Sequence, residues 1–149
     1  MSYRYVLDTE PLLAYYYGEP GGETVRDLLT DVYMGEEAVA VSEITATELM
    51  YKIARFETGS PSGTPTEETP ATGRQAVRDL VDGGVTLCAP SESWPLAAEV
   101  KGAGGIALGD AYAVALAVAE DATLLVGADE DFTELVVDVS VERIRTDPA

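Results

Sequence analysis

The 149-residue sequence contains no histidine and a single cysteine, Cys88. Without histidine, the chain cannot form a Ser-His-Asp triad or a Cys-His dyad, and it has no imidazole for acid–base catalysis. One cysteine can neither close an intramolecular disulfide nor complete a structural zinc site, and this agrees with a reducing cytosol. Catalysis would therefore depend on carboxylates, hydroxyls, a few cations and bound metal.

Long apolar runs are also missing, because no stretch approaches the roughly 20 apolar residues of a membrane span. The N-terminal apolar segment meets Asp8 after only a few residues. That is too soon for the apolar region of about 7–15 residues in a signal peptide. We therefore expect a cytoplasmic protein without membrane association, and the length predicts a single domain over residues 1–149.

Basic residues are scarce, since 9 Lys and Arg stand against 27 Asp and Glu, for a formal net charge of −18. The acidic residues are spread along the chain rather than gathered in a tail. Repulsion on this scale destabilises a compact state in dilute buffer, whereas about 1 M salt shortens the Debye length to roughly 3 Å. The composition favours a halophilic, haloarchaeal-like protein over an ordinary acidic mesophilic one.

Hydrophobic patterning predicts strands that alternate with helices, which is typical of an α/β fold with a mainly parallel sheet. The expected strands are residues 3–7, 38–41, 85–88, 123–126 and 139–144. The expected helices are 12–17, 23–31, 44–56, 74–81, 92–101 and 110–120, with a short helical turn over 129–135. Residues 57–72 hold three Pro and two Gly without apolar periodicity, and predict a flexible loop within the domain.

Four acidic residues stand where parallel α/β folds bind ligands, beyond the carboxyl ends of strands. Asp8 and Asp129 follow predicted strands, Asp110 opens the apolar helix 110–120, and Glu48 lies in the first turn of helix 44–56. Each has a purely structural interpretation. Asp8 and Asp110 could be helix N-caps, Glu48 could complete a capping box, and Asp129 could be a turn residue.

The four acids taken together favour a metal site. A helix that is apolar all round is buried, so Asp110 at its start needs a partner, and the nearest cations in sequence are Lys101 and Arg143. Converging carboxylates repel one another, and a hard divalent cation such as Mg²⁺ or Mn²⁺ relieves that repulsion. Such a metal supports hydrolytic phosphoryl chemistry without histidine, because it activates water and neutralises phosphate charge.

Four segments resemble the PIN-domain nucleases, and VapC-type toxins of toxin–antitoxin pairs in particular. They are Tyr5-Val6-Leu7-Asp8-Thr9, Thr45-Ala46-Thr47-Glu48-Leu49, Leu108-Gly109-Asp110-Ala111 and the run Leu124–Phe132 that ends in Asp-Glu-Asp-Phe. The resemblance implies a three-layer α/β/α fold with about five strands. It implies Asp8, Glu48, Asp110 and Asp129 as catalytic metal ligands, with Asp131 as an accessory ligand. It further implies a Mg²⁺- or Mn²⁺-dependent endoribonuclease that hydrolyses RNA phosphodiester bonds, forms a homodimer and is silenced by an antitoxin protein.

Two positions depart from the family pattern. Glu10 stands where Asn or Ser is usual, and Gly127 stands where Thr or Ser is usual. These departures support an alternative, a catalytically weak PIN-fold module that binds protein. A third reading, an aspartate-based phosphatase or phosphoacceptor with Asp8 as nucleophile, is disfavoured. The Asp-Thr-Glu-Pro segment lacks a second Asp, and no Lys stands at the end of a later strand.

Candidate substrate contacts are Thr9, Lys52 and Arg55. Lys52 and Arg55 lie four and seven residues after Glu48, hence on the same helix face, where they could touch an RNA phosphate. A Glu48–Lys52 ion pair is the favoured alternative. The tyrosines at 15–17 could stack on bases, although a place in the core or a dimer interface is more usual. With so few cations, we expect weak, salt-tolerant RNA binding.

Overall fold

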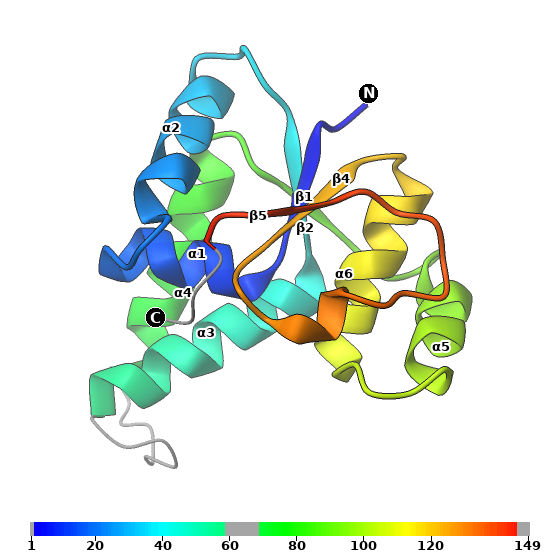
Figure 1. Cartoon of the computed structure of the whole chain (residues 1–149). Helices are drawn as coiled ribbons and strands as arrows, with labels where there is room; N and C mark the ends of the chain where they lie inside the picture. Colours follow the sequence, from blue (N-terminus) through cyan, green and yellow to red (C-terminus); the bar gives the residue numbers. More distant parts are fainter. Residues whose placement is uncertain (1, 59–68, 146–149) are drawn as a thin grey trace.

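The computed structural model describes residues 2–58 and 69–145. The strands are β1 (Tyr5–Leu7), β2 (Val39–Ser42), β3 (Thr86–Cys88), β4 (Thr123–Val126) and β5 (Val141–Arg143). The helices are α1 (Thr9–Tyr17), α2 (Gly22–Tyr33), α3 (Glu43–Thr58), α4 (Thr69–Asp82), α5 (Trp94–Gly102) and α6 (Leu108–Ala119), and a 3₁₀ turn spans Glu130–Phe132. Figure 1 shows the chain and labels most of these elements.

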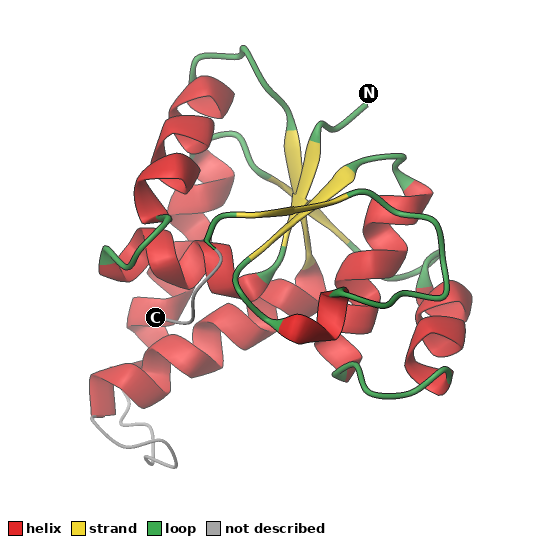
Figure 2. Cartoon of the chain, in the orientation of Figure 1, coloured by secondary structure: helices red, strands yellow, loops and turns green. Residues whose placement is uncertain are grey.

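The five strands form one sheet in the order β3-β2-β1-β4-β5, and every neighbouring pair is parallel. The prediction of a parallel sheet of about five strands is therefore confirmed. Because the strands all run the same way, their carboxyl ends meet at one edge of the sheet. Figure 2 shows this sheet, in yellow, as a layer between two groups of helices.

Alternate residues of the central strands pack against the two helical layers. Val6 and Leu124 belong to the apolar cluster that includes α6 and the end of α5. Leu7 and Leu125 belong to the cluster formed with α1 to α4. Successive side chains of a strand point to opposite faces, so a strand covered on both faces is apolar throughout. The three-layer α/β/α fold implied by the resemblance is confirmed.

The apolar helix α6 is buried, as its composition predicted. Six of its residues are buried among the sheet and α5: Ala111, Ala113, Val114, Ala115, Leu116 and Ala117. The helix begins at Leu108, two residues before the predicted start, so Asp110 is its third residue. A single carboxylate is thus carried at the amino end of an otherwise uncharged core helix.

The predicted loop over residues 57–72 is wrong at both ends. Helix α3 continues to Thr58, and α4 begins at Thr69, while residues 59–68 lie outside the described part. Gly73 lies where α4 packs closely on α3: a Cβ there would lie 2.9 Å from the Cα and carbonyl oxygen of Met50. Tertiary packing therefore makes helical a segment whose composition favours loop.

Other boundaries differ by a few residues. The helix expected over 92–101 starts at Trp94, and Ser93 at its N-cap makes no side-chain cap hydrogen bond. Within residues 2–58 and 69–145, no helix is long and apolar enough to cross a membrane.

Candidate metal centre

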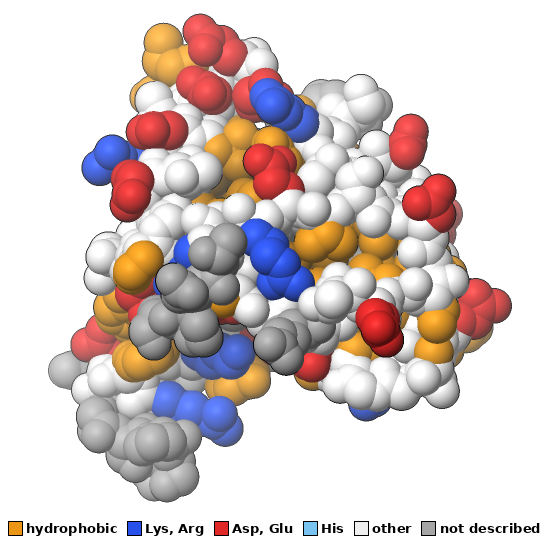
Figure 3. All heavy atoms as spheres, viewed as in Figure 1, with side chains coloured by type: hydrophobic (Ala, Val, Ile, Leu, Met, Phe, Trp, Pro, Cys, Tyr) orange, Lys and Arg blue, Asp and Glu red, His pale blue; other side chains and the backbone are white. Residues whose placement is uncertain are grey.

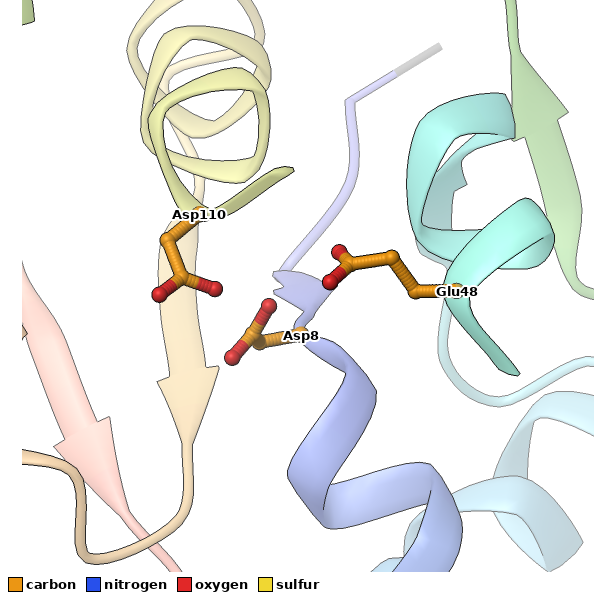
Figure 4. Close-up of side chains that lie close together, drawn as sticks. All are labelled: Asp8, Glu48 and Asp110. Carbon is orange, nitrogen blue, oxygen red and sulfur yellow. The ribbon is translucent and has the colours of Figure 1, made fainter. Parts of the chain in front are cut away.

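Three carboxylates from distant parts of the sequence converge at the carboxyl edge of the sheet. Asp8 directly follows β1, Glu48 comes from α3, and Asp110 comes from the first turn of α6. One oxygen of each lies within 4.8 Å of the others. Figure 4 shows the three side chains pointing toward one another from three separate elements.

Asp110 also belongs to a second group, with Asp129 and Asp131, whose carboxylate oxygens lie within 4.8 Å of one another. Asp129 follows β4, and its Oδ1 accepts a 2.9 Å hydrogen bond from the backbone N–H of Asp131. Asp129 and Asp131 are exposed, whereas Asp8 is 4% exposed. Asp110 is common to two groups that together contain all five predicted site residues and are here called the acidic centre: Asp8, Glu48, Asp110, Asp129 and Asp131.

Capping does not account for the three inner acids. Asp8 occupies the N-cap of α1 but makes no side-chain cap hydrogen bond. The N-cap of α6 is Ala107, not Asp110. Helix α3 begins at Glu43, so Glu48 lies beyond the first turn and forms no capping box. The structural interpretation holds only for Asp129, which takes part in the turn before the 3₁₀ segment.

Asp8 is the most strongly perturbed acid of the centre. Burial raises the pKa of Asp8 well above its ordinary value, and the nearby charges of Asp110 and Glu48 raise it further. The backbone N–H of Thr9 and the charge of Lys52 act in the opposite direction. Its Oδ1 is buried without a hydrogen-bond partner. A buried carboxylate oxygen with no partner is costly, so this atom calls for a ligand or a proton.

Asp110 is perturbed by the same surroundings. The pKa of Asp110 is raised from 3.8 to about 7, first by burial and then by the charges of Glu48, Asp129 and Asp131. Lys52 lowers it again. Lys52 thus acts electrostatically on both Asp8 and Asp110, which places its charge beside the centre.

The donor set fits a hard divalent cation. The five side chains offer only oxygen atoms, which Mg²⁺ and Mn²⁺ prefer, and they carry several mutually repelling charges. The unpartnered Oδ1 of Asp8 is available for coordination. An ion bound here would neutralise the repulsion that raises the pKa values of Asp8 and Asp110.

Gly109 is a residue of the site that sequence reasoning did not single out. A Cβ at this position would lie 2.1 Å from Oε1 of Glu48. The glycine therefore makes room for the Glu48 carboxylate beside the first turn of α6. The only signal in the sequence is its position directly before Asp110.

The predicted substrate contacts have different surroundings. Thr9 is buried, and its Oγ1 donates a 3.3 Å hydrogen bond to Oε1 of Glu48, so it contacts the acidic centre. The expected Glu48–Lys52 ion pair is absent from the salt bridges of the described residues. Arg55 is exposed and stacks over the ring of Tyr51, 4.7 Å from its centroid.

The tyrosines of α1 do not lie in the core. Tyr15, Tyr16 and Tyr17 are 40%, 41% and 37% exposed. Tyr17 packs against Phe56 with ring centroids 5.0 Å apart, which joins the ends of α1 and α3. The sequence favours the core or a dimer interface for these tyrosines. The core position is wrong, because Leu12 and Leu13 take the core-facing positions of α1, and the dimer interface stays a prediction.

An oxygen-only carboxylate cluster at the carboxyl edge of a parallel sheet, without histidine, belongs to the class of sites whose donor atoms suit a hard divalent cation. The chain belongs to the PIN domain family, whose model matches residues 5–137. The membership that the four sequence segments predicted is therefore confirmed.

Solved structures share the fold at low sequence identity. DNA-bound VapBC from Salmonella typhimurium matches with a TM-score of 0.68 and 12% identity, covering 96% of this chain and 99% of that chain. VapBC2 from Rickettsia felis, bound to a DNA fragment from its promoter, matches with a TM-score of 0.63 and 18% identity, covering 93% of this chain and 97% of that chain. FitAB bound to the IR36 DNA fragment matches with a TM-score of 0.59 and 19% identity, covering 94% of each chain. None of the curated proteins compared with this chain matches it.

Proposed function

We propose that this protein is a Mg²⁺- or Mn²⁺-dependent endoribonuclease and the toxin of a toxin–antitoxin pair. The observation that carries the proposal is the buried, unpartnered carboxylate oxygen of Asp8, which lies in a group with Glu48 and Asp110. Asp8, Glu48, Asp110 and Asp129 would hold the metal, and Asp131 would assist. The family match and the likeness to VapBC structures support this choice over other uses of an acidic site.

A bound divalent ion would supply an activated water and neutralise charge on the scissile phosphate. The side chains of this protein set the conditions for that chemistry. Asp8 and Asp110 retain protons more strongly than ordinary carboxyls, so metal binding releases protons and strengthens as the pH rises. Thr9 orients Glu48 through its hydroxyl, and Lys52 places a positive charge where a phosphodiester would approach.

Substrate binding by such an acidic chain must depend little on bulk charge. On the face shown in Figure 3, acidic side chains are scattered, and several basic side chains lie over α3 and near the end of β5, with others at the upper edge and the left side. We infer that Lys52 and Arg55 of α3 contact RNA phosphates locally. Because few counterions are released on binding, affinity for RNA should be weak and should change little with salt.

An antitoxin partner follows from the same assignment, since the solved relatives are named as VapBC complexes. A groove of about 330 Å³ lies between α1, α2 and α4 and has apolar and tyrosine side chains, including Leu12, Leu29 and Tyr33. Tyr33 is 73% exposed at this groove. We propose the groove as the antitoxin surface. The test is co-purification with the product of an adjacent small reading frame, and we expect Leu29→Glu to abolish this association. Light scattering tests the homodimer.

A cleavage assay tests the ribonuclease proposal. The protein is incubated with an RNA pool in concentrated KCl with Mn²⁺ or Mg²⁺, beside an EDTA arm, Asp8→Asn and Asp110→Asn. Asp82→Asn, an exposed aspartate at the end of α4, is the matched control. We expect cleavage that requires metal, Asp8 and Asp110 but not Asp82.

Other outcomes separate the alternatives. Mn²⁺ binding by calorimetry without any cleavage would favour the catalytically weak binding module. Cleavage that persists in Asp8→Asn and Asp110→Asn would show that these residues are not the catalytic acids. Trapping of a phosphoaspartate at Asp8 would favour the phosphatase reading.

A further inference from the structure

The short loop after β4 carries Asp129, and it is held in place by an arginine that is not part of the acidic centre. Arg143, the last residue of β5, donates from Nη1 to the carbonyl oxygens of Gly127 at 3.2 Å and Asp129 at 2.7 Å. Its Nη2 donates to Oγ1 of Thr133 at 3.3 Å. One guanidinium therefore ties both ends of the loop to the segment that follows the 3₁₀ turn.

A second arginine ties the same region to α1. Arg145 forms an ion pair with Glu10 and donates from Nη1 to the carbonyl oxygen of Pro20 at 3.1 Å. Its side chain is only 9% exposed, and its Nε is buried without a hydrogen-bond partner. Glu10 lies in the first turn of α1, two residues after Asp8. The ion pair thus links the segment that follows β5 to helix α1, which begins beside Asp8.

The carboxylate of Glu10 lies over Gly127. A Cβ at Gly127 would be 2.0 Å from Cδ of Glu10 and 2.2 Å from its Oε2. Glu10 and Gly127, the two positions that differ from the family pattern, therefore contact each other. The Glu10 carboxylate, held by Arg145, fills the space that a side chain at position 127 would need. The two departures thus compensate each other and are not two separate losses of site residues.

This arrangement has an electrostatic consequence. Asp8, Asp110, Asp129 and Asp131 carry like charges that tend to separate when no cation is bound. Asp129 and Asp131 are exposed, so they are freer to move away than the buried Asp8. Arg143 opposes this through the loop carbonyls and adds positive charge beside Asp129 without occupying a carboxylate oxygen.

We propose that Arg143 and Arg145 are positioning residues that, with Glu10, hold the Asp129 loop against the first turn of α1 so that the acidic centre is preorganised for a divalent cation. The proposal rests on the metal-dependent function proposed above. Its tests measure loop order and metal affinity, so they remain informative whether or not RNA is cleaved.

The first test compares Arg143→Met and Arg145→Met with the wild-type protein. Residues that orient metal ligands typically change metal affinity by about 10–100-fold, and we expect Mn²⁺ affinity by calorimetry to fall within that range. Arg4→Met is the matched control, since it removes an ion pair with Glu37 before β1, away from the carboxyl edge of the sheet. Arg143→Lys keeps the charge and should restore part of the affinity.

Amide hydrogen exchange of metal-free protein gives a readout that does not need metal. Arg143→Met should accelerate exchange of the Asp131 amide, which is bonded to Asp129, without a matching increase in the core strands. Lower global stability with unchanged loop exchange and unchanged Mn²⁺ affinity would overturn the proposal. If the wild-type protein bound no Mn²⁺, the proposed function would fail, and the exchange result alone would decide on the positioning role.

A double-mutant cycle tests the Glu10–Gly127 contact. Gly127→Ala should displace the Glu10 carboxylate and weaken Mn²⁺ binding in the wild-type background. In a Glu10→Ala background, where that carboxylate is gone, Gly127→Ala should cause no further loss. Additive effects of the two substitutions would contradict the coupling.

Discussion

Removing the metal should make the stability of this protein fall as the pH rises, and Asp110 makes the effect measurable. The pKa of Asp110 is raised from 3.8 to about 7 in the folded protein. In the unfolded chain, the carboxyl ionises near its ordinary value. Between about pH 4 and about pH 7, the folded state therefore binds more protons than the unfolded state, so its stability decreases as the pH rises through this window. Above about pH 7, both states are ionised at Asp110 and the slope from this residue disappears.

The magnitude follows from the shift. About three pKa units correspond to about 4 kcal/mol at roughly 1.4 kcal/mol per unit. Asp110 is only partly buried and shares its shift with neighbouring acids, so solvent screening reduces the contribution to about 2 kcal/mol. Asp8, whose pKa is also raised, adds a slope of the same sign.

Urea unfolding followed by circular dichroism, in EDTA and constant concentrated KCl, would measure this slope. The wild-type protein should lose about 1 kcal/mol more than Asp110→Asn between about pH 5 and about pH 8, because part of the effect of about 2 kcal/mol falls below about pH 5. Asp82→Asn should retain the wild-type slope, and saturating Mg²⁺ should abolish it by binding the ionised carboxylates. Equal slopes for the wild-type protein and Asp110→Asn would refute the reasoning, as would a stability that rises with pH in EDTA.

Three further outcomes are expected. Gly109→Ala should weaken Mn²⁺ binding, measured by calorimetry, because the added Cβ displaces Glu48. Thermal melts should show an unchanged or raised stability, because alanine is favoured over glycine in helices by up to about 1 kcal/mol. Leu124→Ala, at a fully buried position of β4, should cost about 2–5 kcal/mol in urea unfolding, and a loss under about 1 kcal/mol would contradict its place in the core. Lowering KCl from about 3 M to about 0.1 M should unfold or destabilise the chain, and far-UV circular dichroism that does not change would remove the halophilic interpretation.

Local sequence patterns predict the strands and helices, and the tertiary structure changes only their boundaries. The run over 123–126 is β4 without any change of boundary, because an apolar run of this length fits a buried strand and is too short for a helix. The apolar run that ends at Ala119 is long enough for a helix, and it is buried because it has no polar face. The segment over 69–72 shows the limit of local patterns, since residues whose composition favours a loop form the start of α4, which packs closely against α3 at Gly73.

The sequence alone determined the α/β class and the scarcity of cations, because hydrophobic spacing and residue type depend only on covalent order. It also predicted the five acids, through their places in the expected elements and the resemblance of four segments to PIN domains. It did not determine that Glu10 lies over Gly127, that Arg145 pairs with Glu10, or that Gly109 makes room for Glu48. Those contacts join residues up to 135 positions apart. They exist only because a parallel sheet brings its strand ends, and the segments that follow them, to one edge.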